Sequence, residues 1–314
     1  MSGRNMMLCS HCSYSLDPIA KFCEECGTPV GGAAVLNACK CGSRSLDEQG
    51  YCVDCGCRQH VLSAPVINET SAMLACVSDV GRKHPINQDA AQVAVLPDGS
   101  VFLGVADGVS SSNSSELASS TAVSVALNWL ANKPTEDLAV ALSLCVEEAN
   151  AQVKTIPYKP LPDLDEPETT LVVAVVRGAT LHVAWVGDSR AYAMSSAGIR
   201  QLTRDDSWMT DAIENGMSYD DAAANRNAHA ITQCLGMQDE EIIVRYLNVE
   251  LASDEQVVVC TDGLWNYFES VEELHTLFKS VPRDASALTT AQMMVDAANA
   301  AGGRDNVSVA VLRR

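Results

Sequence analysis

Residues 101–110 read VFLGVADGVS, an apolar run that ends in Asp107 and a glycine. A run of this length is typical of a buried strand, and a carboxylate is costly to bury without a partner. The pattern returns at residues 256–263, QVVVCTDG, where the run leads to Asp262. Asp-Gly is also a common turn, so one such run would carry little weight. Two in one chain favour the hypothesis that both carboxylates meet at one site.

The composition is that of a globular protein with a sizeable core: 47% of the 314 residues are apolar and 19% are charged. The net charge of -19 argues against nucleic acids and anionic membranes as partners, and suits a site that collects metal ions. No apolar run approaches the roughly 18 to 20 residues of a membrane span, and the first residues lack a signal-peptide pattern. We therefore expect a cytoplasmic protein.

Nine of the 13 cysteines lie before residue 60, which in a cytoplasmic protein points to bound metal and not to disulfides. They form two similar blocks of four thiolates, the number that tetrahedral zinc takes. We predict two structural Zn2+ ions, held by Cys9, Cys12, Cys23 and Cys26 in one block and by Cys39, Cys41, Cys52 and Cys55 in the other. Cys57 and His60 are left over, and either could replace a ligand in the second block.

Both blocks resemble zinc ribbons, which we place at residues 1–32 and 36–60. Segments this short cannot bury a core, so the metal must supply the folding free energy, roughly 10 kcal/mol or more per site. Four protein ligands leave no open position for catalysis. Residues 1–60 hold five Lys/Arg against six Asp/Glu, which is not the basic footprint of nucleic-acid binding. We expect the ribbons to dock a partner protein.

Residues 61–71 are expected to form a linker, and residues 72–314 one larger domain. Residues 91–107 and 171–194 predict strands joined by short turns, whereas residues 135–154 have helical periodicity. Strands joined mostly by hairpins form antiparallel sheets. Because the helices are inserted between strand pairs, the pattern favours the α+β class over a doubly wound parallel sheet.

Four aspartates occupy similar places at the edges of predicted strands: Asp89, Asp107, Asp262 and Asp305. A sandwich can bring such residues together at one rim, where they repel one another unless a cation holds them. Oxygen ligands select hard ions such as Mg2+ or Mn2+. Two such ions about 4 Å apart can share a water, lower its pKa and aim it at a phosphoryl group.

Residues 72–314 resemble the metal-dependent protein phosphatases of type 2C, which remove phosphate from Ser and Thr in proteins. Eight motifs carry the resemblance, in order along the domain: SDVGRKHPINQDA, VFLGVADGVS, ETTLVVAVV, LHVAWVGDSRAY, QLTRDDSW, ITQCLG, VVVCTDGLW and GGRDNVSVAVL. The fold that this implies is a central antiparallel β-sandwich flanked by helices.

The resemblance also implies a ligand set. Asp107 would bridge two ions, the Gly108 carbonyl would bind one of them, and Asp262 and Asp305 would hold the other. Asp89 would contact the ions directly or through water. A water activated by both ions would then attack phosphorus in line, so that no protein nucleophile is needed.

Further roles follow from the same resemblance. Asn306 would orient a neighbouring carboxylate, and Asp163 would share with Asp262 a third ion that bacterial members often carry. Asp188 and Arg190 of the hallmark GDSRAY are expected to form an internal ion pair. Residues 204–230 match the flap that lies beside the site in bacterial members.

The match fails at three places. His84 stands where the family usually has the arginine that clamps the substrate phosphate, and His is only partly charged at pH 7. Arg82 is near enough in sequence to substitute for it. Asn266 replaces an aspartate, and residues 167–170, PETT, replace a Met-Gly-Thr-Thr stretch near the third ion.

Two hypotheses follow. The first is an active protein Ser/Thr phosphatase whose zinc ribbons dock a substrate, a kinase or a complex. The second is a catalytically weak phosphatase-like domain that binds phosphoproteins as a regulator or scaffold, and His84 is the best argument for it. The retained Asp107, Asp262 and Asp305 favour the enzyme.

Overall fold

The computed structural model describes residues 7–8, 15–16, 65–133, 136–160, 164–268 and 270–314. The chain divides into two units, Met1–Ala64 and Pro65–Arg314. In the first unit, β1 (Met7–Leu8) pairs antiparallel with β2 (Ser15–Leu16), and the two strands flank Cys9 and Cys12 in the sequence. All eight predicted zinc ligands lie outside the described residues.

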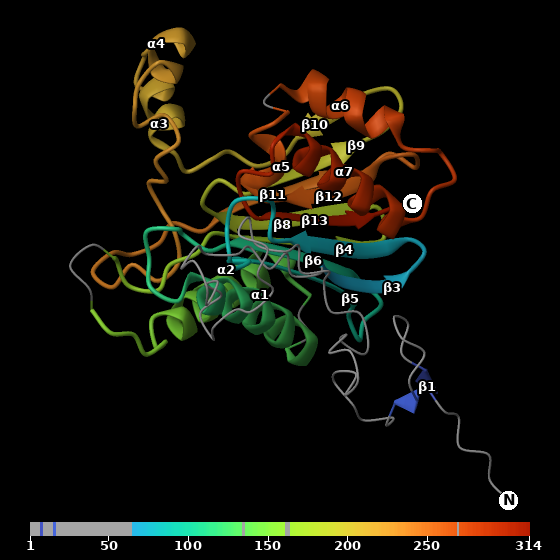
Figure 1. Ribbon diagram of the computed structural model, residues 1–314, viewed down its shortest axis with the longest axis horizontal. Helices are drawn as coiled ribbons and strands as arrows, with labels where there is room; N and C mark the ends of the chain where they lie inside the picture. The colour runs from blue at the N-terminus through green and yellow to red at the C-terminus, as the bar shows by residue number, and fades with distance from the viewer. Residues whose placement is uncertain (1–6, 9–14, 17–64, 134–135, 161–163, 269) are drawn as a thin grey trace, which may run out of the picture. The chain divides into compact units, whose positions relative to one another are not determined.

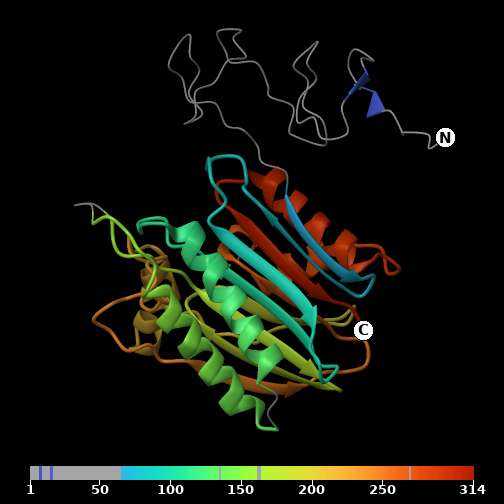
Figure 2. The same cartoon turned by 90° about the horizontal axis from the view of Figure 1, so that it is seen from below.

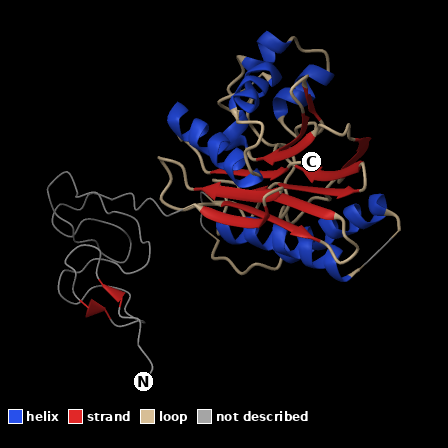
Figure 3. Ribbon diagram, turned by 90° about the vertical axis from the view of Figure 1, so that its right-hand side faces the viewer, coloured by secondary structure: helices blue, strands red, loops and turns tan. Residues whose placement is uncertain are grey.

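The larger unit is built on two antiparallel sheets packed face to face (Figures 1 and 3). The six-stranded sheet has the order β10 (Ile199–Gln201), β9 (Arg190–Met194), β12 (Gln256–Cys260), β13 (Val307–Leu312), β4 (Leu74–Asp79), β3 (Val66–Ser71). The five-stranded sheet has the order β11 (Arg245–Glu250), β8 (Thr180–Val186), β7 (Leu171–Arg177), β6 (Val101–Asp107), β5 (Asp89–Val95). The predicted sandwich is confirmed.

The apolar runs of the sequence arise because most strands are buried on both faces. Successive side chains of a strand point to opposite sides of the sheet. In β6, Leu103 and Val105 face the core between the two sheets, together with Val257 and Val259 of β12. Phe102 points the other way, into the core beneath the helices. Continuous apolar strands are therefore stable here although the sheets are antiparallel.

Helices cover both outer faces of the sandwich. The pair α1 (Ser115–Asn132) and α2 (Leu138–Val153) lies on the five-stranded sheet (Figure 2). The six-stranded sheet is covered by α5 (Asp262–Trp265), α6 (Val271–Ser280) and α7 (Ala287–Ala301). Two short helices, α3 (Trp208–Glu214) and α4 (Tyr219–Ala223), project from the sandwich (Figure 1). Within the described residues, no helix is long and apolar enough to cross a membrane.

The structure differs from the sequence prediction at the start of this unit. Residues 66–71, expected to belong to the linker, form β3 and pair with β4. Every residue of β3 is exposed, so its sequence lacks the apolar alternation that marks a half-buried strand. The strand exists because β4 offers it a backbone partner, with a register shift between Glu69 and Ser71.

The core between the sheets predicts a large effect for one substitution. Leu103 is 0% exposed, so Leu103→Ala should lower the free energy of unfolding by about 2–5 kcal/mol through lost burial and a cavity. Urea unfolding measures this. Leu117→Ala, at a position 46% exposed on α1, is the control and should change stability by about 0.5 kcal/mol or less. Equal losses in both variants would contradict the described core.

Candidate active site

The sandwich brings the four predicted aspartates to one edge. Asp89 opens β5 and Asp107 closes β6, and the two residues are direct partners in the β5–β6 register. Asp262 follows β12, and Asp305 precedes β13. Since β12 and β13 are antiparallel neighbours, the end of one and the start of the other share an edge of the second sheet.

A hydrogen bond joins the two sheets at this edge. The Thr261 hydroxyl donates to Asp89 Oδ2 at 2.8 Å, across 172 residues of sequence. Thr170 and Thr169 fix the backbone of Asp107, because Thr170 Oγ1 accepts from its N–H at 2.9 Å and Thr169 Oγ1 donates to its carbonyl at 2.8 Å. The two threonines of the PETT stretch therefore hold Asp107 in place.

Burial and mutual repulsion make these carboxylates unusually basic. Burial raises the pKa of Asp89 and of Asp107 well above the ordinary aspartate value, and the charge of Asp262 raises both further. Burial also raises the pKa of Asp262 to about 6, with repulsion from Asp305 as the next cause. The hydrogen bonds from Thr261 to Asp89 and from Asn266 to Asp262 act in the opposite direction but are outweighed.

The donor set fits a hard divalent cation. Asp89 Oδ1 and Asp262 Oδ1 are buried and have no hydrogen-bond partner among the described residues. Unpaired buried carboxylate oxygens are costly, and a bound cation would satisfy both. Among the described residues, no three His, Cys, Asp or Glu side chains lie close enough together to hold a metal ion as they stand. Mg2+ does not need three, since it usually keeps several waters and takes only one or two protein carboxylates.

Gly108 allows the backbone to pass close to this edge. A Cβ atom there would lie 2.5 Å from the Ser115 carbonyl oxygen and 2.6 Å from the Gln88 carbonyl oxygen. Any side chain would therefore push the Asp107–Gly108 turn away from α1. The glycine predicted as a carbonyl ligand is required at this position on steric grounds alone.

Asn306 braces the segment that leads to Asp89. Its Oδ1 accepts from the Gln88 N–H at 2.7 Å, and its Nδ2 donates to the Val80 carbonyl at 2.8 Å and to the Ile86 carbonyl at 3.1 Å. Its own backbone N–H donates to Asp305 Oδ1 at 2.8 Å. Asn306 therefore fixes the backbone just before Asp89 and contacts the Asp305 carboxylate, as expected of a residue that orients a neighbouring carboxylate without binding the ion itself.

The predicted phosphate-binding residues, His84 and Arg82, lie near the same edge of the sandwich as the four aspartates. His84 Nε2 is 3.4 Å from Asp305 Oδ1. Arg82 is turned toward Asp79, with 3.7 Å between Nη1 and Oδ1, and its backbone N–H donates to the Gly303 carbonyl at 2.7 Å. Asp163, predicted for a third ion, lies outside the described residues.

A cleft of about 270 Å3 opens beside the carboxylates. It is lined by His229, Gly263, Asn266, Tyr267, Arg304 and Asp305. His229 comes from the predicted flap, and no sequence pattern marks it as a site residue. Arg304 was also missed, because a single exposed arginine forms no pattern, although its position next to Asp305 was a usable signal.

The expected Asp188–Arg190 ion pair is wrong. Arg190 binds Asp205 instead, with 2.7 Å between Nη2 and Oδ2, and its guanidinium lies 3.6 Å over the Trp265 ring. Asp188 precedes β9, and its Oδ1 is buried without a partner among the described residues. Burial, then repulsion from Asp262, raises its pKa. Asp188 is therefore a fifth carboxylate of the cluster.

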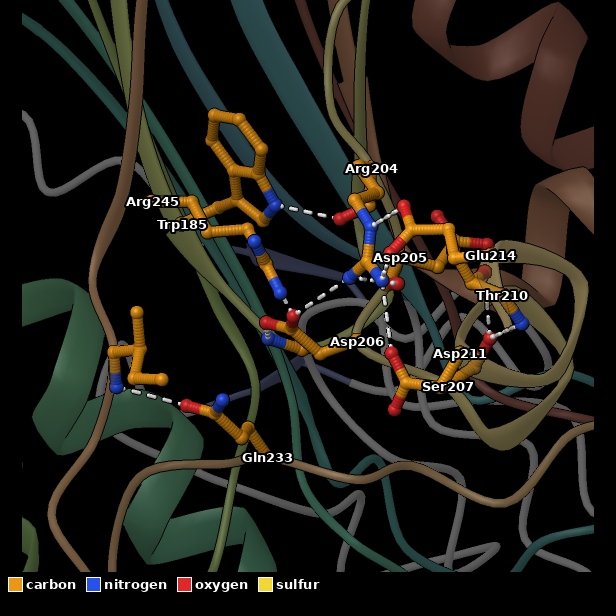
Figure 4. Close-up of polar contacts among 12 residues, drawn as sticks. Trp185, Arg204, Asp205, Asp206, Ser207, Thr210, Asp211, Glu214, Gln233 and Arg245 are labelled. Atoms are coloured by element: carbon orange, nitrogen blue, oxygen red, sulfur yellow. Dashed lines mark hydrogen bonds and ion pairs between the residues drawn. The ribbon is translucent and has the colours of Figure 1, made fainter.

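The flap is fixed to the sandwich at its base (Figure 4). Arg204 Nη2 lies 2.6 Å from Glu214 Oε2 and 2.8 Å from Asp211 Oδ1, which anchors both turns of α3. Arg245, on β11, donates a hydrogen bond of 2.6 Å from Nε to Asp206 Oδ1. Arg204 Nη1 also lies 3.5 Å from Asp206 Oδ1, so a chain of ion pairs links α3 to the five-stranded sheet.

Comparison with known proteins agrees with this geometry. Residues 81–297 match the family model of protein phosphatase 2C, and residues 8–30 match that of a zinc-ribbon domain. The serine/threonine phosphatase stp of Listeria welshimeri is 28% identical over 242 residues, which cover 76% of this chain and 94% of that protein.

Solved structures share the fold. A serine/threonine phosphatase of S. agalactiae superimposes with a TM-score of 0.67 at 23% identity, over 80% of this chain and 99% of that one. The catalytic domain of the serine threonine protein phosphatase PstP in complex with two manganese ions does so with a TM-score of 0.61 at 25% identity, over 80% of this chain and 99% of that one.

An antiparallel sandwich with a carboxylate cluster at its rim defines a metal-dependent phosphatase class. The chain belongs to the protein phosphatase 2C family, and with it to the enzymes that use divalent metal ions to remove phosphate from Ser and Thr in proteins. The zinc-ribbon match at residues 8–30 supports the first of the two predicted ribbons.

The basic carboxylates predict an unusual dependence of stability on pH. A carboxyl whose folded-state pKa is raised stabilises the fold below its unfolded pKa, and loses this contribution as pH rises through the folded value. With chelator, the phosphatase unit should therefore be less stable at pH 8 than at pH 5.5. Added Mn2+ should raise the melting temperature more at pH 8 than at pH 5.5.

Tryptophan fluorescence reports this unit alone, because the four tryptophans are Trp129, Trp185, Trp208 and Trp265. Asp262→Asn removes one of the titrating groups and should flatten the pH dependence. Asp239→Asn, at an exposed position, should not. A metal-free protein that gains stability from pH 5.5 to pH 8 would contradict the electrostatic description.

Proposed function

We propose that this chain hydrolyses phosphoserine and phosphothreonine in proteins with two Mn2+ or Mg2+ ions at the rim formed by Asp89, Asp107, Asp262 and Asp305. The observation that carries the proposal is the convergence of buried, repelling carboxylates from both sheets beside an open cleft. The Gly108 carbonyl completes the proposed ligand set, and Asp163 would serve a third ion. Bound ions would offset the free-energy cost of burying several ionised carboxylates together.

The chain's own groups set the geometry. When bound, two divalent ions lower the pKa of a water and stabilise charge on the phosphoryl group. Thr261 and Asn266 hold the side chains of Asp89 and Asp262 through hydrogen bonds of 2.8 Å each. The cysteines of the described residues are buried, and burial raises the pKa of each thiol. No described cysteine is therefore a thiolate nucleophile.

Two basic side chains can receive the substrate phosphate. Arg304 lines the cleft beside Asp305, and His84 lies against the same carboxylate. The planar guanidinium of Arg304 can bind two phosphate oxygens at once, whereas the ring of His84 offers one donor in a given direction. We assign the capture of the phosphate to Arg304 and His84 together, in the place of the arginine that the family usually has.

We propose that the cysteine blocks bind one Zn2+ ion each and dock a partner protein, with no part in the chemistry of the rim. The zinc-ribbon match at residues 8–30 supports the first block. The near balance of charge in residues 1–60 favours a protein partner over nucleic acid. Thiolate zinc sites and free buried cysteines also suit the reducing cytoplasm, where we place the protein.

Phosphate release from a phosphothreonine peptide tests the catalytic proposal. We expect release with Mn2+ or Mg2+ and none with chelator. Asp262→Asn keeps the size of the side chain but removes a metal ligand, and should lower kcat/KM by about 100-fold or more. Asp239→Asn is the matched control and should match the wild type.

A folded wild-type chain that releases no phosphate at any metal concentration would favour the regulator that binds phosphoproteins without hydrolysing them. In that case His84→Arg should restore activity if the weak phosphate clamp is the cause.

Metal analysis of the purified chain tests the ribbons. We expect about two Zn2+ ions per chain, four thiolates for each ion. The double substitution Cys9→Ser and Cys12→Ser should remove one ion and leave hydrolysis of a small aryl phosphate unchanged. A zinc content that does not change in this variant would show that these cysteines are not ligands.

A further inference from the structure

A second cavity, of about 480 Å3, lies at the opposite end of the strands that carry the active site. Four cations line it: Lys279, Arg283, Arg313 and Arg314. Asp254 is the single carboxylate among its lining residues. In a chain with 21 Lys/Arg against 40 Asp/Glu, a cavity with four cations and one anion runs against the overall charge.

The protein offers these cations little opposing charge: Asp254 lines the cavity, and Asp284 acts electrostatically on Arg313. Among the described residues, none of the four forms an ion pair, since the pairs found all involve other basic side chains. Two of the arginines are instead held by neutral acceptors. Arg313 donates to Thr290 Oγ1 at 3.2 Å and to the Arg283 carbonyl at 2.5 Å, and Arg314 donates to the Ala252 carbonyl at 3.3 Å. The two guanidinium groups are thus oriented by neutral acceptors and not by carboxylates.

The rest of the lining suits a ligand larger than a free ion. Phe278, Val281 and Pro282 supply an apolar wall. The Oε1 atom of Gln256, which also lines the cavity, is buried and has no hydrogen-bond partner among the described residues. A peptide offers both a stem to pack on the wall and N–H groups for such an acceptor. The volume falls in the usual range of ligand pockets, about 300–1,000 Å3.

The fold separates this cavity from the catalytic rim. Asp262 follows the last residue of β12, whereas Asp254 and Gln256 lie at its start. Asp305 precedes β13, whereas Arg313 and Arg314 follow its end. At about 3.3 Å per residue, the two sites are on the order of 20 Å apart. An anion in the cavity is therefore far from the carboxylate cluster that would repel it.

We propose that this cavity binds a phosphate group on a phosphorylated peptide segment, as a docking site separate from the catalytic rim. Arginine forks match the oxygens of a phosphate, and a compact dianion suits several cations held in one cavity. Clusters of arginine are a recurrent means of recognising phosphorylated segments. The inference rests on the proposed function, because it takes phosphoproteins as the substrates, and it assigns them a second contact with the enzyme.

Peptide binding without catalysis tests the inference. The Asp262→Asn chain in chelator would be titrated into a fluorescent phosphothreonine peptide, with anisotropy as the readout. Adding Lys279→Gln and Arg283→Gln, two exposed positions, should weaken binding about tenfold or more, since each charged hydrogen bond is worth more than about 1.4 kcal/mol. Inorganic phosphate should compete.

The matched control is the double substitution Lys133→Gln and Lys159→Gln, which removes the same net charge at exposed positions outside the cavity and should leave binding unchanged. In the active chain, Lys279→Gln with Arg283→Gln should leave kcat/KM for a small aryl phosphate unchanged and raise KM for a doubly phosphorylated peptide. Unchanged peptide affinity in the cavity variant would overturn the proposal. Equal affinity for a peptide with Glu in place of phosphothreonine would overturn the assignment to phosphate.

Because binding is measured in a chain that cannot hydrolyse the peptide, this result does not depend on catalysis. A chain that binds the peptide through the cavity but never releases phosphate would contradict the proposed function alone. A chain that releases phosphate but binds equally well without the cavity cations would contradict the docking site alone.

Discussion

The repulsion among buried carboxylates at one rim of the sandwich is the constraint on which the rest of this structure depends. Asp89 and Asp188 are buried and Asp107 and Asp262 are half-buried, and loss of hydration together with mutual repulsion raises the pKa of each. A fold that only needed stability would place apolar residues there, because a buried charge without a partner costs more than it contributes. Once these carboxyls are ionised, divalent cations offset their repulsion, and that need for cations connects the architecture to phosphoryl chemistry.

The hydrogen-bonded strands of the two sheets fix the positions of the clustered aspartates relative to one another. Asp89 and Asp107 are register partners in one sheet, and Asp262 and Asp305 flank paired strands in the other. Close backbone contacts fix the remaining freedom: a Cβ atom at Gly263 would lie 1.8 Å from the Asn306 carbonyl oxygen. The same strands extend to the opposite end of the sandwich, where cations take the place of carboxylates. One pair of strands thus presents an acidic rim at one end and a basic cavity at the other.

The sequence predicts those strands and site residues that leave a local pattern in it. The apolar runs that end in Asp107 and Asp262 indicate both the strands and the site. Buried strands need apolar side chains, whereas a metal site needs carboxylates, so the two aspartates stand out at the ends of the runs. Edge strand β3 leaves no such pattern, since all its residues are exposed. The partner of Arg190 could not be predicted either, because Asp205 reaches it through the fold and not through a periodic spacing. His229 and Arg304 meet at the cleft for the same reason.

The most direct test of the central claim is the number of protons released when Mn2+ binds. Calorimetric titration of the zinc-saturated chain at pH 6, repeated in two buffers of different ionisation enthalpy, gives this number. Carboxyls with raised pKa values must lose their protons to bind the metal, so we expect proton release with Mn2+ binding, and less release in the Asp262→Asn chain. Binding without proton release, or no binding at all, would contradict the claim that repelling buried carboxylates form the metal site.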